Sequence, residues 1–123
     1  MVISYYRCMM LTYYNEEVLP LNFDESAVLS LEWVNQSTDL HVKLDWLNDP
    51  SIDSDAPPTL AFAFVTHFDA QFAFPPGKMG TMEIGTIRFS RLESERWSVE
   101  IAFYFQPVGH IRFHCDDIQF SHS

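Results

Sequence analysis

Histidines and acids gather near the end of the chain, where 110–117 reads His-Ile-Arg-Phe-His-Cys-Asp-Asp. Imidazole, thiolate and carboxylate groups are the side chains that hold metal ions and transfer protons. Polar and apolar residues alternate over 110–115, however, which is the period-two pattern of a β-strand. On a strand, His110 and His114 lie roughly 13 Å apart, too far to share one metal ion. We therefore interpret these histidines and Arg112 as solvated residues of one outer face.

The run from His114 to Asp117 places several metal-ligand types next to each other. Neighbouring residues of a strand point to opposite faces, so these side chains do not converge. We predict a strand end here, with a bulge at Asp116 and Asp117. The two cysteines, Cys8 and Cys115, belong to no C-x-x-C motif, and we predict free thiols. They can pair only if the first and last segments of the chain are neighbours.

Three aspartates, Asp49, Asp53 and Asp55, lie in a proline-rich segment at 48–58. Acidic loops can bind Ca²⁺ through oxygen ligands, but the spacing lacks the calcium-loop pattern and its distal Glu. Neither a G-x-S-x-G motif nor a glycine-rich phosphate loop occurs. We therefore predict a solvated acidic loop, no cofactor and no enzymatic activity.

The elements that position these residues are predicted to be strands. Apolar and polar residues alternate over 28–34, 39–46, 97–105 and 110–115. Residues 60–65 are apolar on both faces, which favours a central strand covered on both sides. From there to Phe74, the pattern fits either one long bent strand or a hairpin near 67–71. We predict an all-β fold: a single domain over 1–123, built as an antiparallel β-sandwich or strongly curved sheet of about seven strands.

The last two alternating segments can be given a register. A three-residue loop over 107–109 suits Pro followed by Gly in the left-handed conformation, and it keeps the faces matched. This loop places Phe103 opposite Phe113 on the apolar face. On the polar face it places Tyr104 opposite Arg112, a possible geometry for a cation–π contact.

The first two alternating segments also predict a hairpin. A four-residue loop over 36–39 sets Glu32 opposite Lys43. A two-residue turn preserves the faces as well, but it sets Glu32 opposite His41. Because opposite charges stabilise a cross-strand pair, the pairing with Lys43 is favoured.

Two further segments are less regular. The alternation slips at Gly85, which indicates a β-bulge. Residues 4–19 have apolar groups at both strand and helix spacing, so either a strand or one short N-terminal helix is possible. Pro20 ends that element.

Charge is distributed unevenly along the chain. It has 17 acidic and 7 basic side chains, a formal net charge of −10. Residues 1–61 hold ten of the acids but only Arg7 and Lys43, a net of −8, whereas 62–123 are nearly balanced at −2. Such a field repels nucleic acid and anionic membranes and attracts basic surfaces. With no secretory signal and no apolar run that could span a membrane, we expect a cytoplasmic protein.

In general profile the chain looks like small acidic toxin-neutralising (immunity) or inhibitor proteins, which are often single domains that block a basic site. The resemblance is one of class, and no motif carries it. It implies a non-catalytic interaction protein that binds, and possibly neutralises, a basic protein partner. The acids expected to contact that partner lie in loops or on outer faces: Glu32, Asp39, Asp45, Asp49, Asp53 and Asp55.

Two other classes of function fit the same composition. A small-molecule or carbohydrate-binding β module would use exposed aromatics beside carboxylates, for example Tyr104 with Glu100. A structural subunit would assemble through an exposed strand edge or through the tyrosine-rich start. Acidity that only confers solubility is the alternative to all of these.

Overall fold

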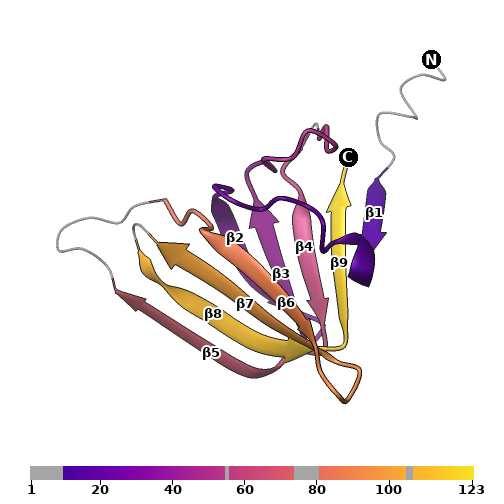
Figure 1. Ribbon diagram of the computed structural model, residues 1–123, viewed down its shortest axis with the longest axis vertical. Coiled ribbons are helices and arrows are strands. Elements are labelled where there is room, and N and C mark those ends of the chain that lie inside the picture. Colours follow the sequence, from indigo (N-terminus) through magenta and orange to yellow (C-terminus); the bar gives the residue numbers. More distant parts are fainter. Residues whose placement is uncertain (1–9, 55, 74–80, 105–106) are drawn as a thin grey trace.

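The computed structural model describes residues 10–54, 56–73, 81–104 and 107–123, which form two antiparallel β-sheets (Figure 1). The five-stranded sheet has the order β1 (Leu11–Tyr14), β9 (Asp117–His122), β4 (Thr59–Ala63), β3 (Asp39–Leu44) and β2 (Val28–Val34). The four-stranded sheet has the order β5 (Thr66–Ala73), β8 (Val108–Cys115), β7 (Trp97–Tyr104) and β6 (Thr86–Arg91). The predicted all-β fold is confirmed, with nine strands in these residues rather than about seven.

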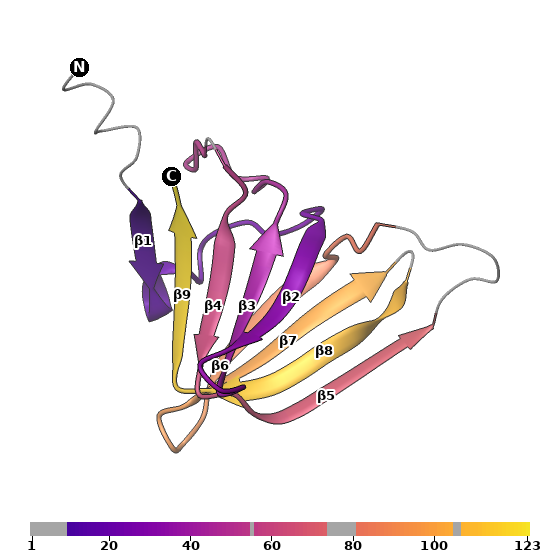
Figure 2. The same ribbon diagram turned by 180° about the vertical axis from the view of Figure 1, so that it is seen from behind.

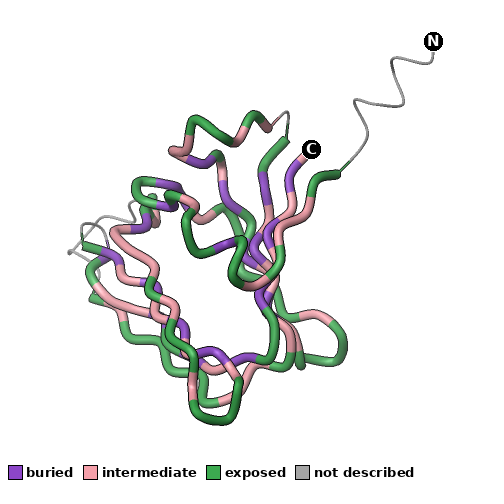
Figure 3. The backbone as a smooth tube through the Cα atoms, turned by 45° about the vertical axis from the view of Figure 1, so that its right-hand side comes forward, coloured by how far each residue is buried: buried purple, intermediate pink, exposed green. Residues whose placement is uncertain are grey.

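The core lies between the inner faces of the two sheets. β7 follows the predicted alternation closely, because every second residue from Trp97 to Phe103 is buried and the residues between are not. β3 does the same from Leu40 to Leu44. Figure 3 shows these buried stretches along the strands and exposed stretches at the loops. Alternation therefore predicts which face of these strands points inward.

The two sheets meet at one corner and diverge away from it (Figures 1 and 2). The chain passes between them twice at this corner: at 64–65, between β4 and β5, and at Asp116, between β8 and β9. β4 and β5 thus form a bent path rather than the alternative hairpin. The predicted strand end near Asp116 is confirmed, but this residue is a crossover between sheets rather than part of a bulged strand.

The predicted register of the β7–β8 hairpin is wrong, although its faces are matched as expected. Ile101 lies opposite Ile111, and Tyr104 lies opposite Val108, so the connection lies between Tyr104 and Val108 and not over 107–109. Gly109 belongs to β8, where an added Cβ would collide with the backbone of Gln71 on β5. The glycine therefore permits a close approach of strands, and it does not form the left-handed turn.

The favoured register of the β2–β3 hairpin is also wrong. Glu32 lies opposite His41, which is the alternative pairing, and the loop covers 35–38. Asp39 closes this loop, because its carboxylate accepts hydrogen bonds from Asn35 Nδ2 (2.6 Å) and Thr38 Oγ1 (3.1 Å). These bonds outweigh one exposed cross-strand charge pair, which is worth about 0.2–1 kcal/mol.

The N-terminal segment combines both of its predicted alternatives. β1 is a short strand paired with β9, and a 3₁₀ turn, η1 (Asn15–Glu17), follows it directly. The chain turns at Pro20, and residues 4–9 of the predicted element lie outside the described part. Because β1 pairs with β9, the first and last segments are neighbours. Cys115 is a buried free thiol whose pKa burial raises to about 12, and Cys8 lies outside the described residues.

Candidate functional site

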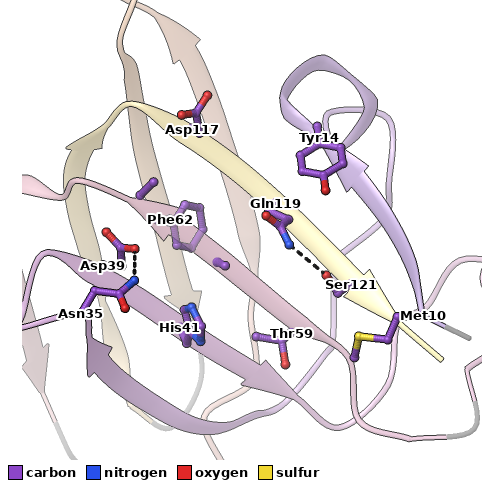
Figure 4. Close-up of a pocket in the computed structure, with 12 residues that line it drawn as sticks. Met10, Tyr14, Asn35, Asp39, His41, Thr59, Phe62, Asp117, Gln119 and Ser121 are labelled. Atoms are coloured by element: carbon purple, nitrogen blue, oxygen red, sulfur yellow. Dashed lines mark hydrogen bonds between the residues drawn. The ribbon is translucent and has the colours of Figure 1, made fainter. Parts of the chain in front are cut away.

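A hollow of about 700 Å³ lies on the outer face of the five-stranded sheet, over β4 (Figure 4). Its floor consists of Thr59, Ala61 and Ala63, the small outward side chains of β4. Larger polar side chains on β3 and β9 stand on either side of this floor, because the strand register places them there. We call this hollow the sheet trough. The prediction that β4 is a central strand is confirmed, but the prediction that both its faces are covered is wrong.

Two aspartates flank the floor at one end of the sheet trough. Asp117 on β9 lies directly opposite Ala63. Asp39 on β3 lies one position beyond the Leu40–Phe62 pair, on the other side of Ala63. With about 4.8 Å between adjacent strands, the two aspartate backbones are roughly 10 Å apart. An ammonium or guanidinium group entering over Ala63 can therefore lie between the two carboxylates.

The carboxylate of Asp39 is held in place as an anion. It accepts hydrogen bonds from the backbone N–H of Phe64 (3.0 Å), from Asn35 Nδ2 and from Thr38 Oγ1. These donors, the Phe64 amide first among them, lower the pKa of Asp39 below its usual 3.8. Asp117 accepts a hydrogen bond from Asn15 Nδ2 (3.2 Å). The acidic end of the trough thus carries charges with fixed positions.

The middle of the sheet trough is lined by polar side chains, and it carries no charge while the imidazole of His41 is neutral. His41, Ala61, Gln119 and Tyr14 form one row across β3, β4, β9 and β1. Tyr14 is 53% exposed at the β1 side. At the far end, Ser121 Oγ lies 3.4 Å from Gln119 Nε2, and Met10 stands beside it (Figure 4). Hydrogen-bond donors and hydrogen-bond acceptors therefore both face the trough along its whole length.

The six predicted partner-binding acids do not form one cluster. Asp39 lines the sheet trough. Asp45 instead accepts hydrogen bonds from the backbone of Ala27 and Trp46, and Asp49 accepts them from Asn22 and Ser51. The donors around Asp49, the Ser51 hydroxyl foremost, lower its pKa. These two carboxylates stabilise loops, whatever else they do.

The other three predicted acids differ from these. The carboxylates of Glu32, on the outer face of the edge strand β2, and of Asp53, in the loop before β4, form no hydrogen bond or ion pair with any described residue. Asp55 lies outside the described residues. Of the six, Asp39 is therefore the acid that the structure places in a concave site, and Glu32 is on the same sheet face two strands from the floor.

The sequence prediction missed Asp117, Gln119 and Tyr14 as trough residues. Asp117 is predicted at a bulge, because the pattern indicates a strand end at this point but not a crossover to the other sheet. One signal was available, however. Ala61 and Ala63 alternate with Leu60 and Phe62, so the outer face of this central strand has no large side chain. A central strand with only small residues on one face leaves a hollow between its neighbours.

The outer face of the four-stranded sheet has a different electrostatic character. Arg88, Glu100, Arg112 and Asp69 form a row across β6, β7, β8 and β5, with alternating charge. Arg112 Nε lies 2.5 Å from Glu100 Oε2, so the predicted contact of Arg112 with Tyr104 is wrong. Glu100 is also no longer available to a sugar beside Tyr104, whose hydroxyl lies 3.2 Å from Thr86 Oγ1. This face neutralises its own charges.

The described residues contain no group of three or more His, Cys, Asp or Glu side chains that could hold a metal ion. Within the same residues no helix has the length and apolar character needed to cross a membrane. A comparison with protein families and with curated proteins finds no match to this chain. The fold and the site thus define a two-sheet β protein with an open, acidic-ended trough on one sheet.

Proposed function

We propose that this protein is a non-catalytic interaction protein that binds a basic protein partner through the outer face of its five-stranded sheet. The observation that supports the proposal best is the pair Asp39 and Asp117 on either side of Ala63, at the end of an open trough. An Arg or Lys side chain of the partner would enter between the two carboxylates. Arg fits the spacing best, because its planar guanidinium presents several donors at once.

The charge distribution supports this choice of face. Asp39 and Asp117 line the trough and Glu32 lies on the same sheet face, with Lys43, beside Thr59, as a basic residue of that face. The opposite sheet, in contrast, pairs its charges across the strands. A partner with a basic surface is therefore attracted to the trough face, and its association rate depends on salt.

The state of Asp39 favours binding over catalysis. A carboxyl group that acts as a general acid near neutral pH needs a raised pKa. Hydrogen bonds lower the pKa of Asp39, so this residue remains ionised and suits a permanent ion pair. If the partner uses its basic surface for its own activity, the bound protein covers that surface, which is how an immunity or inhibitor protein acts. The proposal places this in the reducing cytoplasm, where a thiol such as Cys115 remains reduced.

The test is an affinity capture from the native source at low and at high salt, with the wild type and two variants. Ala61→Leu fills the trough floor without changing charge, and Ala102→Leu makes the same change on the outer face of β7. We expect one basic protein to bind the wild type and Ala102→Leu, to bind Ala61→Leu much less, and to dissociate at high salt. A partner that binds all three chains equally would contradict the proposal.

A second candidate function is the binding of a neutral small molecule or carbohydrate. The middle row of the sheet trough favours it, because the exposed ring of Tyr14 lies beside Gln119 and opposite His41. Aromatic stacking and amide hydrogen bonds of this kind do not depend on ionic strength. A titration with neutral oligosaccharides, followed by amide chemical shifts, would show changes confined to β1, β4 and β9 that persist at high salt.

A further inference from the structure

The edge strand β2 presents apolar side chains that the opposite sheet does not cover. Leu29, Leu31 and Trp33 are 54%, 40% and 42% exposed, although Leu31 and Trp33 face inward opposite the buried residues Val42 and Leu40. Trp33 contacts Phe68 of β5, with 5.1 Å between ring centroids, and Phe68 itself is 42% exposed. Figure 2 shows β2 at the edge of its sheet, with the two sheets separating away from the corner at which β2 ends. The apolar alternation of 28–34 therefore predicts the strand correctly, but it does not lead to burial.

The backbone of β2 is also free on one side over part of its length. The chain before β2 is covered, because Ala27 bridges Glu83 and the Val28 N–H donates to the Met82 carbonyl. No described segment pairs with β2 beyond this point on the side away from β3. Exposed edges that carry apolar residues are templates for pairing with another chain.

The direction of the free backbone groups can be derived from the ladder. The Leu44 N–H donates to the Pro58 carbonyl, which points it toward β4 and away from β2. Backbone groups alternate in direction along an antiparallel strand. In β3 those of His41 therefore point toward Glu32 of β2. It follows that in β2 the backbone groups of Leu31 and Trp33 point to the free edge.

We propose that β2 is a self-association edge, at which two copies of this chain pair their β2 strands antiparallel with Leu31 on the twofold axis. This register pairs Leu31 with Leu31 of the second copy and leaves Trp33 beside this pair, so these exposed apolar side chains cover one another. The regular part of the edge begins after Leu29, because the register of β2 shifts between Val28 and Ser30. It sets Glu32 opposite Ser30 on the other face. The pairing joins the two five-stranded sheets into one continuous sheet with closed twofold symmetry.

Charge selects this register over its nearest competitor. Shifting one strand by two residues also directs free backbone groups at one another, with Leu31 opposite Trp33. That shift would place Glu32 directly opposite Glu32 of the second copy, in a non-hydrogen-bonded pair, where the side chains are closest. Two like charges in such a pair destabilise the pairing of the strands. In the proposed register, Glu32 is the only charged residue of β2, and it lies opposite the neutral Ser30 of the second copy.

The first measurement is the sedimentation of the full chain over a range of concentrations, at low and at high salt. Each copy carries a net charge of −10, so added salt should increase the dimer fraction by screening repulsion. Binding of a basic partner has the opposite salt dependence, and the two proposals can therefore fail separately. Leu31→Lys should abolish the dimer, and Gln71→Lys on the other exposed edge strand, β5, should leave it unchanged.

Crosslinking tests the register. In a Cys8→Ser background, Leu31→Cys places two thiols in a pair with Cα atoms about 5.5 Å apart, within disulfide range. Leu29→Cys adds the same thiol but leaves the two copies roughly 13 Å apart. Cys115 does not interfere, because it is buried and its pKa is raised to about 12. Oxidation should crosslink Leu31→Cys several-fold more than Leu29→Cys. A chain that stays monomeric at every concentration, a dimer insensitive to Leu31→Lys, or equal crosslinking of both cysteine variants would overturn the proposal.

Discussion

The guanidinium of Arg96 joins the two crossovers between the sheets, because its Nε lies 2.7 Å from Oδ1 of Asp116. The same side chain donates from Nη1 to Thr66 Oγ1 (2.6 Å) and from Nη2 to the carbonyl of Phe64 (2.5 Å). The Asp116 N–H in turn donates to the carbonyl of Ala63 (2.8 Å). One arginine therefore fixes the corner from which the acidic end of the sheet trough is built.

Replacing Arg96 should destabilise the fold more than any exposed charge does. Arg96→Ala removes three hydrogen bonds at a side chain that is 22% exposed, and it should lower the free energy of unfolding by roughly 2–3 kcal/mol. Arg96→Lys keeps the charge but not the fork of donors, so it should recover only part of this loss. Urea unfolding measures both. Lys43→Ala, at an exposed site, is the control and should stay within about 0.5 kcal/mol of the wild type.

The corner also explains how far the sequence could predict the fold. Strands such as β3 and β7 are predictable, because an alternating pattern must bury its apolar set. The crossovers are not, because the apolar pattern continues through 64–65, and the strand end predicted near Asp116 does not indicate that the chain changes sheets there. What turns the chain there is Arg96, which lies some 20 and 30 residues away from Asp116 and Thr66 in sequence. Long-range contacts of this kind leave no periodic signal.

The residues of the candidate site were predictable where they depend on the local pattern and not where they depend on long-range contacts. Asp39 is predicted as an acid in a loop or on an outer face, and it lines the sheet trough. Asp117 was missed, because its position depends on β9 leaving β8 for the other sheet and pairing with β4. Asp45 and Asp49 are likewise predicted to contact the partner, and the sequence does not show that their carboxylates accept backbone hydrogen bonds. The sequence predicts where a carboxylate lies along the chain more readily than it predicts which groups that carboxylate contacts.

Two glycines that approach other strands should respond differently to an added methyl group. At Gly109 a Cβ would collide with the carbonyl of Gln71, which is backbone and cannot move without breaking the β5–β8 pairing. At Gly85 it would collide with the ring of Tyr104, which is 53% exposed and can rotate away. We expect Gly109→Ala to cost about 2 kcal/mol or more and Gly85→Ala about 1 kcal/mol or less. Thermal unfolding of the two variants, compared side by side, checks the order, and equal losses would contradict it.

The row of alternating charges on the four-stranded sheet, Arg88, Glu100, Arg112 and Asp69, should show energetic coupling between neighbouring charges. Glu100 lies between Arg88 and Arg112, so Glu100→Gln leaves two arginines flanking a neutral residue. Exposed ion pairs contribute about 0.2–1 kcal/mol each. We therefore expect a double-mutant cycle between Glu100→Gln and Arg112→Gln to give a coupling free energy in that range, decreasing with added salt. A coupling free energy of zero at low salt would show that these surface charges lie side by side without contributing to stability.

Acid should destabilise the protein through His114. Its ring lies 4.6 Å from that of His67, and its pKa is lowered below the usual 6.5 by burial first, then by His67 and Arg96. The unfolded chain therefore takes up the proton before the folded protein does. Stability is unaffected above about pH 6.5, falls as the pH drops from there toward the folded pKa, and levels off below it.

Unfolding curves between pH 5 and pH 8, a range chosen to span the usual histidine pKa of about 6.5, test this dependence. His114→Gln should flatten the loss of stability below pH 6.5, because the group that titrates is gone. His67→Gln should only reduce it, since burial of His114 remains the larger cause. This graded result identifies His114 as the group that titrates. If both variants kept the wild-type slope, the acid sensitivity would belong to other groups, and the tilted pair of imidazoles, His67 and His114, would have no part in it.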